Sequence, residues 1–260
     1  MNVGHICSLA RYTFLGNIRN RIFLVLILFG GVLLSASVLL SILGQEQAIR
    51  ILTDLGLASI EILALFTAIF LIVNLILEQI EQRTIYLVLT RAISRLDYLL
   101  GSYLGTLAAI FVCVAIMTLI HLGILFLNGW KIQQDGVMYF TSVFMSFEKI
   151  VLISALGLFF SLYSSSAVAA LVFTFFFWTL GHFAVELKFL AEKIQNGALK
   201  AFFKFIYYLI PHLQYMNARD LWISYQDRFT ALSLQGTLYT VLYSAVALSL
   251  AYAAFRKKEF

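Results

Sequence analysis

Four polar side chains lie within long apolar stretches of this sequence: Glu61, Asn74, His121 and His182. A polar group in such surroundings is costly to bury, so each is a candidate functional residue. Glu61 fits either a carboxylate that reaches the outer interface or the polar lining of an outward cavity. Asn74 predicts a hydrogen bond between helices. His121 fits a packed ring and a pore-facing ring equally well.

The sequence offers little for hydrolytic or metal chemistry. It contains neither the His-Glu-x-x-His pattern of zinc proteases nor the Gly-x-Ser-x-Gly turn of a serine nucleophile. His182 and Glu186 have the spacing of two ligands on one helical turn, but no third ligand is near in the sequence. We therefore expect no catalytic residue and no metal site.

A phosphate-binding loop is also missing from the sequence. No Gly-x-x-x-x-Gly-Lys-Ser/Thr pattern occurs, and no glycine directly precedes a lysine. We expect no cofactor in this chain and no enzymatic activity of its own. If ATP drives its function, a separate chain must bind the ATP and Mg²⁺.

The composition is that of an integral membrane protein. Of the 260 residues, 62% are hydrophobic and 12% are charged, whereas soluble domains average about 45–50% and about 25%. Two cysteines are too few for a disulfide framework. A net charge of +5 in so apolar a chain indicates the cytoplasmic flanks of membrane spans rather than nucleic-acid binding.

The apolar runs predict an all-α fold with six transmembrane helices in a single domain, 1–260. A span needs roughly 20 apolar residues. The uncharged run 150–183 is too long for one span, so we divide it at the three serines 164–166. The predicted spans are 22–43, 55–77, 98–127, 150–163, 167–184 and 231–255.

Basic residues predict the orientation. Three arginine- and lysine-rich groups, at 11–21, 83–95 and 256–258, fall on one side if there are six spans. Because such groups face the cytoplasm, both termini are expected there. The segment 185–228 then lies outside despite six basic residues, and a five-span chain is the alternative.

Amphipathic patterns predict helices outside the spans. Gly4–Asn20 fits an interfacial helix on the cytoplasmic side, or a charged lead-in to the first span. Two further runs, 187–194 and 199–210, separated by Asn196-Gly197 and stopped by Pro211, predict an outer amphipathic hairpin between spans 5 and 6. Such a hairpin would flank a path through the membrane or anchor in lipid headgroups.

The segment 78–95 is the most polar stretch in the first half of the chain. Leu77, Ile80, Thr84 and Leu87 recur at helical spacing, which leaves the charged side chains facing water. Ser94 has the capping-box spacing to Asp97 and is expected to start the third span. By these patterns alone, the segment is either a docking helix or a solvated connector.

This segment resembles the hallmark of ABC transporter permeases of the type-2 exporter class. The similarity rests on Glu78 and Glu81, on the Arg-Thr-Ile of 83–85 and on the Arg-Ala-Ile-Ser-Arg of 91–95. It extends to the Asp-Leu-Gly-Leu of 54–57, the Leu-Ile-Pro-His-Leu of 209–213 and the basic, aromatic tail 255–260. Ala92 and Ser102 depart from the proline and lysine that the family often has. The subgroup it resembles includes the permease for copper-site maturation of nitrous oxide reductase.

The resemblance implies a coupling helix that contacts an ATPase. The motif positions are Glu78, Glu81, Arg83, Thr84, Arg91 and Arg95. It further implies two copies of an ABC ATPase, a homodimer or a similar permease chain, and the cytoplasmic (inner) membrane with its lipids. The four polar span residues are then candidates for a translocation path. The alternative is a subunit that transmits ATPase work to an extracytoplasmic accessory protein without passing a substrate.

Overall fold

The computed structural model describes residues 2–42, 44, 47–81, 93–164, 166–218 and 229–257. Within these ranges the side chains of 22, 75–81, 133–135 and 229–230 are not described. The described residues form helices and turns, with no strand among them. The helices are α1 (Val3–Arg19), α2 (Arg21–Ile42), α3 (Ala48–Glu81), α5 (Arg95–Leu127), α6 (Ile132–Tyr163), α7 (Ala167–His182), α8 (Ala184–Lys193), α9 (Gly197–Leu209), the 3-10 turn η2 (Leu213–Met216) and α11 (Phe229–Lys257).

The long helices α2, α3, α5, α6 and α11 each contain a stretch apolar and long enough to cross a membrane. Helices α7 and α8 reach that length only as a pair, and the chain bends by 66° between them. The protein is thus an all-α membrane protein with five candidate spans, or six if the bent pair counts as one. The predicted fold class is confirmed.

The fourth and fifth spans differ from their predicted bounds. Helix α6 begins at Ile132, far ahead of the expected 150, and runs through Glu148 and Lys149. Both side chains are buried against neighbouring helices, so these charges do not interrupt the helix. The fifth predicted span, 167–184, ends as a straight helix at His182, where the chain turns into α8.

Local capping explains why several helices begin and end where expected. Ser94 Oγ accepts a hydrogen bond from the Asp97 amide at 3.0 Å and starts α5, as its spacing predicts. The serine turn ends α6, and Ser164 Oγ accepts from the Ser166 amide at 3.1 Å. Asn196 caps α9 through the Ala198 amide at 3.0 Å. These side chains satisfy amides that the helices leave free.

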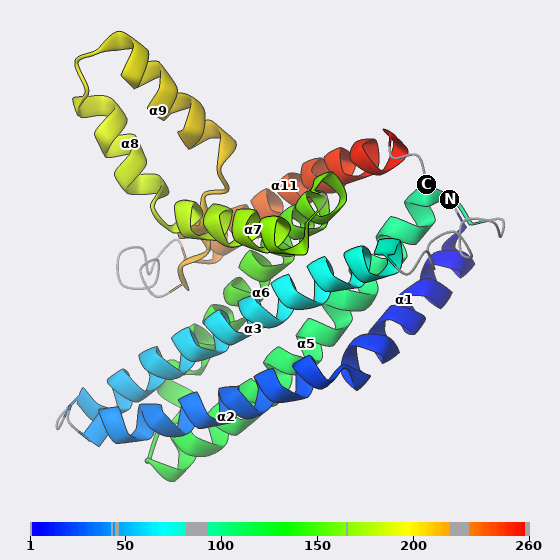
Figure 1. The fold of residues 1–260 in the computed structure, drawn as a ribbon. Coiled ribbons are helices and arrows are strands. Elements are labelled where there is room, and N and C mark those ends of the chain that lie inside the picture. Colours follow the sequence, from blue (N-terminus) through cyan, green and yellow to red (C-terminus); the bar gives the residue numbers. More distant parts are fainter. Residues whose placement is uncertain are drawn as a thin grey trace.

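Both described ends of the chain meet the first turn of α5 (Figure 1). The Asn2 amide donates to Asp97 Oδ2 at 3.4 Å. Arg95 Nη1 donates to the carbonyl oxygens of Phe255 and Arg256, each at 2.9 Å, at the C-terminal end of α11. The two ends therefore lie on the same side of the bundle as residues 93–95. That this side is cytoplasmic stays a prediction.

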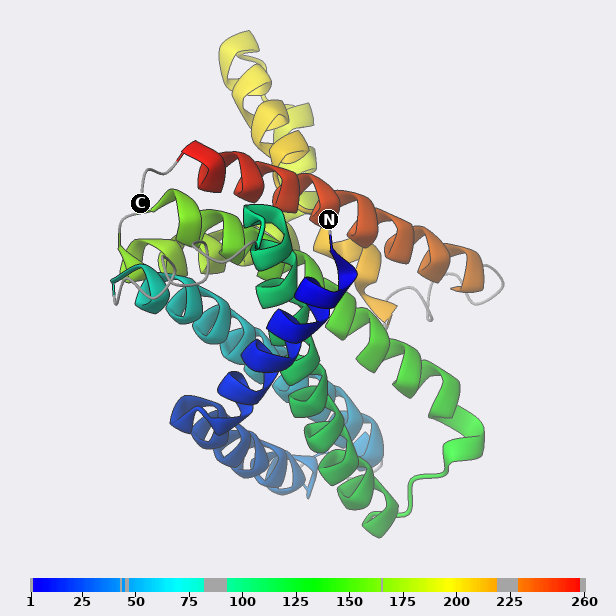
Figure 2. The same cartoon turned by 90° about the vertical axis from the view of Figure 1, so that its right-hand side faces the viewer.

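Helix α1 packs closely along the first half of α5, which it crosses in Figure 2. A Cβ at Gly101 would lie 2.6 Å from Leu9 Cβ, and one at Gly105 would collide with the Ala10 carbonyl. Asn17 Nδ2 donates to Thr106 Oγ1 at 3.1 Å in the buried contact. The N-terminal helix is confirmed, and its place in the membrane interface stays a prediction.

Helices α8 and α9 form a hairpin that projects away from the long helices (Figures 1 and 2). No residue of α9 is buried, and Phe202 and Phe205 are 56% and 65% exposed. The predicted amphipathic hairpin therefore exists. Its outer location follows from the predicted orientation.

The α1–α5 contact yields a prediction. Gly105→Ala should lower the free energy of unfolding by about 1–3 kcal/mol, because the added methyl group overpacks the contact with Ala10 and Thr13. Thermal unfolding of the detergent-solubilised protein measures this effect. Gly123→Ala is the matched control, since a Cβ there meets nothing within 4 Å. Equal melting temperatures for the two variants would contradict the close packing.

Candidate functional site

A buried ion pair joins α3 to α6. Lys149 Nζ donates to Glu61 Oε1 at 2.9 Å and to Oε2 at 3.0 Å. Ser146, one turn earlier on α6, donates to Oε2 at 2.9 Å. The side chains of Lys149 and Glu61 are only 7% and 10% exposed. Each charge is tolerated at so buried a position because the other compensates for its lost hydration.

His182 adds a third helix to this cluster. Its Nε2 lies 3.5 Å from Glu61 Oε1, and its Nδ1 lies 3.1 Å from the Trp178 carbonyl oxygen. Both neighbours are acceptors, so both contacts are hydrogen bonds only when the ring carries a proton on each nitrogen. His182 is the last residue of α7, at the 66° bend. Glu61, Lys149 and His182 are hereafter the polar cluster.

The structure therefore brings together two of the four polar span residues singled out in the sequence. Lys149 is not among the predicted site residues, because the predicted spans 98–127 and 150–163 leave it in the loop between them. A lysine close to one apolar segment and a glutamate within another are nevertheless a usable signal of a buried pair. Glu61 does not extend to an interface as a lone carboxylate, since three donors hold it inside the bundle.

His121 lies elsewhere, in a packed environment between α3, α5 and α6. Its Nδ1 is 2.9 Å from the Tyr139 hydroxyl and its Nε2 is 3.3 Å from the Leu52 carbonyl oxygen. The ring is fully buried and occupies the space that a side chain at Gly56 would need. Of the two interpretations of His121, this geometry fits the packed one.

The remaining predicted site residues are described only in part. Asn74 is half-buried in α3, and its hydrogen bond between helices stays a prediction. Arg95 is bound to the end of α11, as described above. Glu78 and Glu81 belong to α3, but their side chains lie outside the described residues, as do Arg83, Thr84 and Arg91 altogether. In the part of the chain that is described, no three His, Cys, Asp or Glu side chains gather as a metal site.

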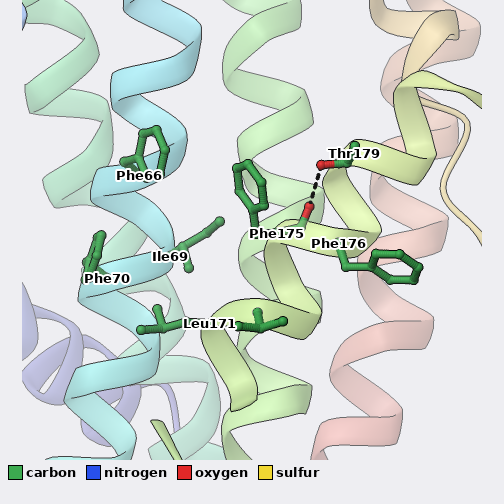
Figure 3. Close-up of a pocket in the computed structure, with 8 residues that line it drawn as sticks. Phe66, Ile69, Phe70, Leu171, Phe175, Phe176 and Thr179 are labelled. Atoms are coloured by element: carbon green, nitrogen blue, oxygen red, sulfur yellow. Dashed lines mark hydrogen bonds between the residues drawn. The ribbon is translucent and has the colours of Figure 1, made fainter. Parts of the chain in front are cut away.

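An apolar groove of about 390 Å³ runs between α3 and α7 (Figure 3). Its walls are aromatic and aliphatic, and the rings of Phe66 and Phe175 stack with centroids 6.0 Å apart. The Thr179 hydroxyl is satisfied within its own helix by the Phe175 carbonyl at 3.0 Å. The lining residues are Phe66, Ile69, Phe70, Leu171, Val172, Phe175, Phe176 and Thr179.

The polar cluster lies next to one end of this groove. His182 follows the lining residue Thr179 by less than one turn on α7, and Glu61 precedes Phe66 on α3. A groove walled by apolar rings can accommodate an apolar molecule along its length. The groove depends on the packing of α7 against α3 and is not predictable from local sequence, although the aromatic run 173–177 is a signal for it.

Long apolar helices that bury a charged cluster, with an apolar groove between two of them, are the features of a multi-pass membrane protein. The model of the family described as ABC-2 family transporter protein matches residues 13–260. The chain belongs to this family and is a membrane permease of an ABC system, which works with an ABC ATPase. No curated protein matches the chain.

The ion pair yields a prediction of its own. Lys149→Leu should lower the free energy of unfolding by about 3–5 kcal/mol, because Glu61 is left buried without its cation. The double variant Glu61→Leu with Lys149→Leu should recover most of this loss, since no charge remains buried unpaired. Melting temperatures of the purified variants measure both effects, with Lys131→Leu on the exposed start of α6 as the control. A double variant as unstable as the single one would argue against the pairing.

Proposed function

We propose that this chain is the permease subunit of an ATP-driven exporter of the cytoplasmic membrane. The observation that carries the proposal is the apolar groove between α3 and α7 in a permease of an ABC system. Two permease chains, identical or similar, work with two ATPase subunits that bind the ATP and Mg²⁺. The chain itself performs no catalysis.

The open side of the groove supports assembly in pairs. Its lining residues Val172 and Phe176 are 59% and 53% exposed in the single chain. A second permease chain facing this side would convert the open groove into an enclosed path. The apolar walls favour an apolar or amphipathic cargo over a small ion, because such walls offer an ion no compensation for its lost hydration.

Helix α3 supports coupling to the ATPase. It is continuous from Glu61 through the groove residues to Glu81, at the start of the segment 82–92. On the far side of that segment, α5 begins at Arg95. Force applied by an ATPase to the segment would thus act directly on a rigid helix that forms one wall of the groove. We assign the ATPase contact to Glu78, Glu81, Arg83, Thr84, Arg91 and Arg95.

A specific observation favours the second candidate, a subunit that transmits ATPase work to an extracytoplasmic partner. The α8–α9 hairpin presents Phe189, Phe202 and Phe205 with more than half of each side chain exposed. Exposed aromatic side chains gathered on one hairpin are a candidate contact surface for another protein outside the membrane. In this alternative the groove carries no cargo.

Charge reversal tests the coupling assignment. Arg83→Glu and Arg91→Glu should each abolish co-purification of the ATPase while leaving the permease inserted in the membrane. Each change reverses a charge of the permease segment that we assign to the ATPase contact, so the charges of the two partners no longer match. Lys204→Glu on α9 is the matched reversal outside the docking segment and should retain the ATPase. Normal ATPase recovery with both arginine variants would remove the assignment.

Blocking the groove separates the two candidates. Val172→Trp should fill the groove and abolish complementation of a strain that lacks the permease, while ATPase assembly continues. A pair of changes on the hairpin, Phe202→Ser with Phe205→Ser, should leave export in place. The opposite pattern, loss through the hairpin and not through the groove, would favour force transmission.

A further inference from the structure

The α8–α9 hairpin leaves and rejoins the bundle at one closed base. Gln214 Nε2, on η2, donates to the His182 carbonyl oxygen at 3.0 Å. Gly181 lies so close to η2 and the residues before it that an added Cβ would be 2.7 Å from the Pro211 carbonyl oxygen and 2.8 Å from Leu213. The two ends of the hairpin are therefore joined to each other, and its base is held against the end of α7.

The side chain of His182 links this base to the rest of the bundle. Its backbone carbonyl faces η2, while its ring faces Glu61 on α3. One residue thus connects the hairpin base with the carboxylate that already joins α3 to α6. A displacement of the base from α3 requires the contact between His182 and Glu61 to break.

The contacts within the polar cluster differ in length and in burial. Glu61 is held by Lys149 at 2.9 and 3.0 Å and by Ser146 at 2.9 Å, all buried. The contact to His182 is longer, at 3.5 Å, and the side chain of His182 is 32% exposed. The chain is also bent directly after it, since Phe183 leaves the helical conformation at φ −95° and ψ 19°. The longest and most exposed contact of the cluster therefore coincides with the break in the chain.

From this arrangement we propose that His182 is a positioning residue, whose contact with Glu61 is a releasable latch. When the latch is closed, it holds the hairpin base and the end of α7 against α3. When it opens, α7 moves away from α3 at Thr179, and this end of the groove widens. The Glu61–Lys149 pair stays intact in both states and keeps α3 on α6. The latch concerns the position of α7 and holds whether the groove passes a cargo or not.

Thiol labelling in the assembled permease–ATPase complex tests the latch. Thr179→Cys places the reporter at the clustered end of the groove, in a Cys7→Ser background, because Cys113 is buried and Cys7 is exposed. A water-soluble methanethiosulfonate reagent then reports how accessible this end is. His182→Leu should raise the labelling rate by at least about fivefold, the low end of typical coupling effects. His182→Gln, which keeps a donor, should label more slowly than His182→Leu.

Two further variants separate the latch from a general loss of structure. Glu148→Gln alters the neighbouring buried carboxyl, which faces Thr237 on α11, and should leave the rate unchanged. The double variant Glu61→Leu with Lys149→Leu leaves no buried charge unpaired but removes the carboxylate that His182 contacts. It should recover most of the stability lost in Lys149→Leu and still label as fast as His182→Leu.

Either of two outcomes would overturn the proposal. One is labelling of His182→Leu at the original rate. The other is slow labelling of the double leucine variant, which would show that Glu61 does not hold α7. If His182→Leu does not fold, the double leucine variant still decides the question, because it leaves His182 in place.

Discussion

The buried pair of Glu61 and Lys149 is the interaction on which the arrangement of the spans depends. Each charge is tolerable in the apolar bundle only because the other lies 2.9 Å away. The pair therefore fixes how α3 and α6 lie against each other, both along their axes and in their facing. Helix α7 packs on the two helices so fixed and forms the groove with α3. Loss of one partner alone would leave a buried charge that this arrangement cannot compensate.

Features set by local sequence were predictable. Ser94 and Asp97 start α5 within one turn, and the serines after Tyr163 end α6, because a cap or a turn needs only near neighbours. The amphipathic hairpin and the N-terminal helix also follow from local periodicity. The family resemblance was carried by the local segment 78–95, and the match over 13–260 bears it out.

The polar cluster was not predictable in the same way. Lys149 resembles an interfacial lysine until its partner is known, and that partner is 88 residues away in the chain. The predicted start of the fourth span at 150 is wrong for the same reason. A lysine marks the end of an apolar run unless its partner carboxylate is known, and here that partner is Glu61. His182 presents a similar case, because its role depends on the bend between α7 and α8 and on a partner, Glu61, that is far away in the chain.

Two adjacent residues of α6 face different neighbouring helices. Lys149 faces α3, whereas Glu148 faces Thr237 on α11. Successive residues on a helix are about 100° apart, so both partners are met at only one rotational setting of α6. Rotation of α6 about its own axis would separate both contacts at once inside the apolar bundle. Helix α6 thus relates α3 to α11 through two neighbouring residues, and a change in its rotation would be felt by both helices.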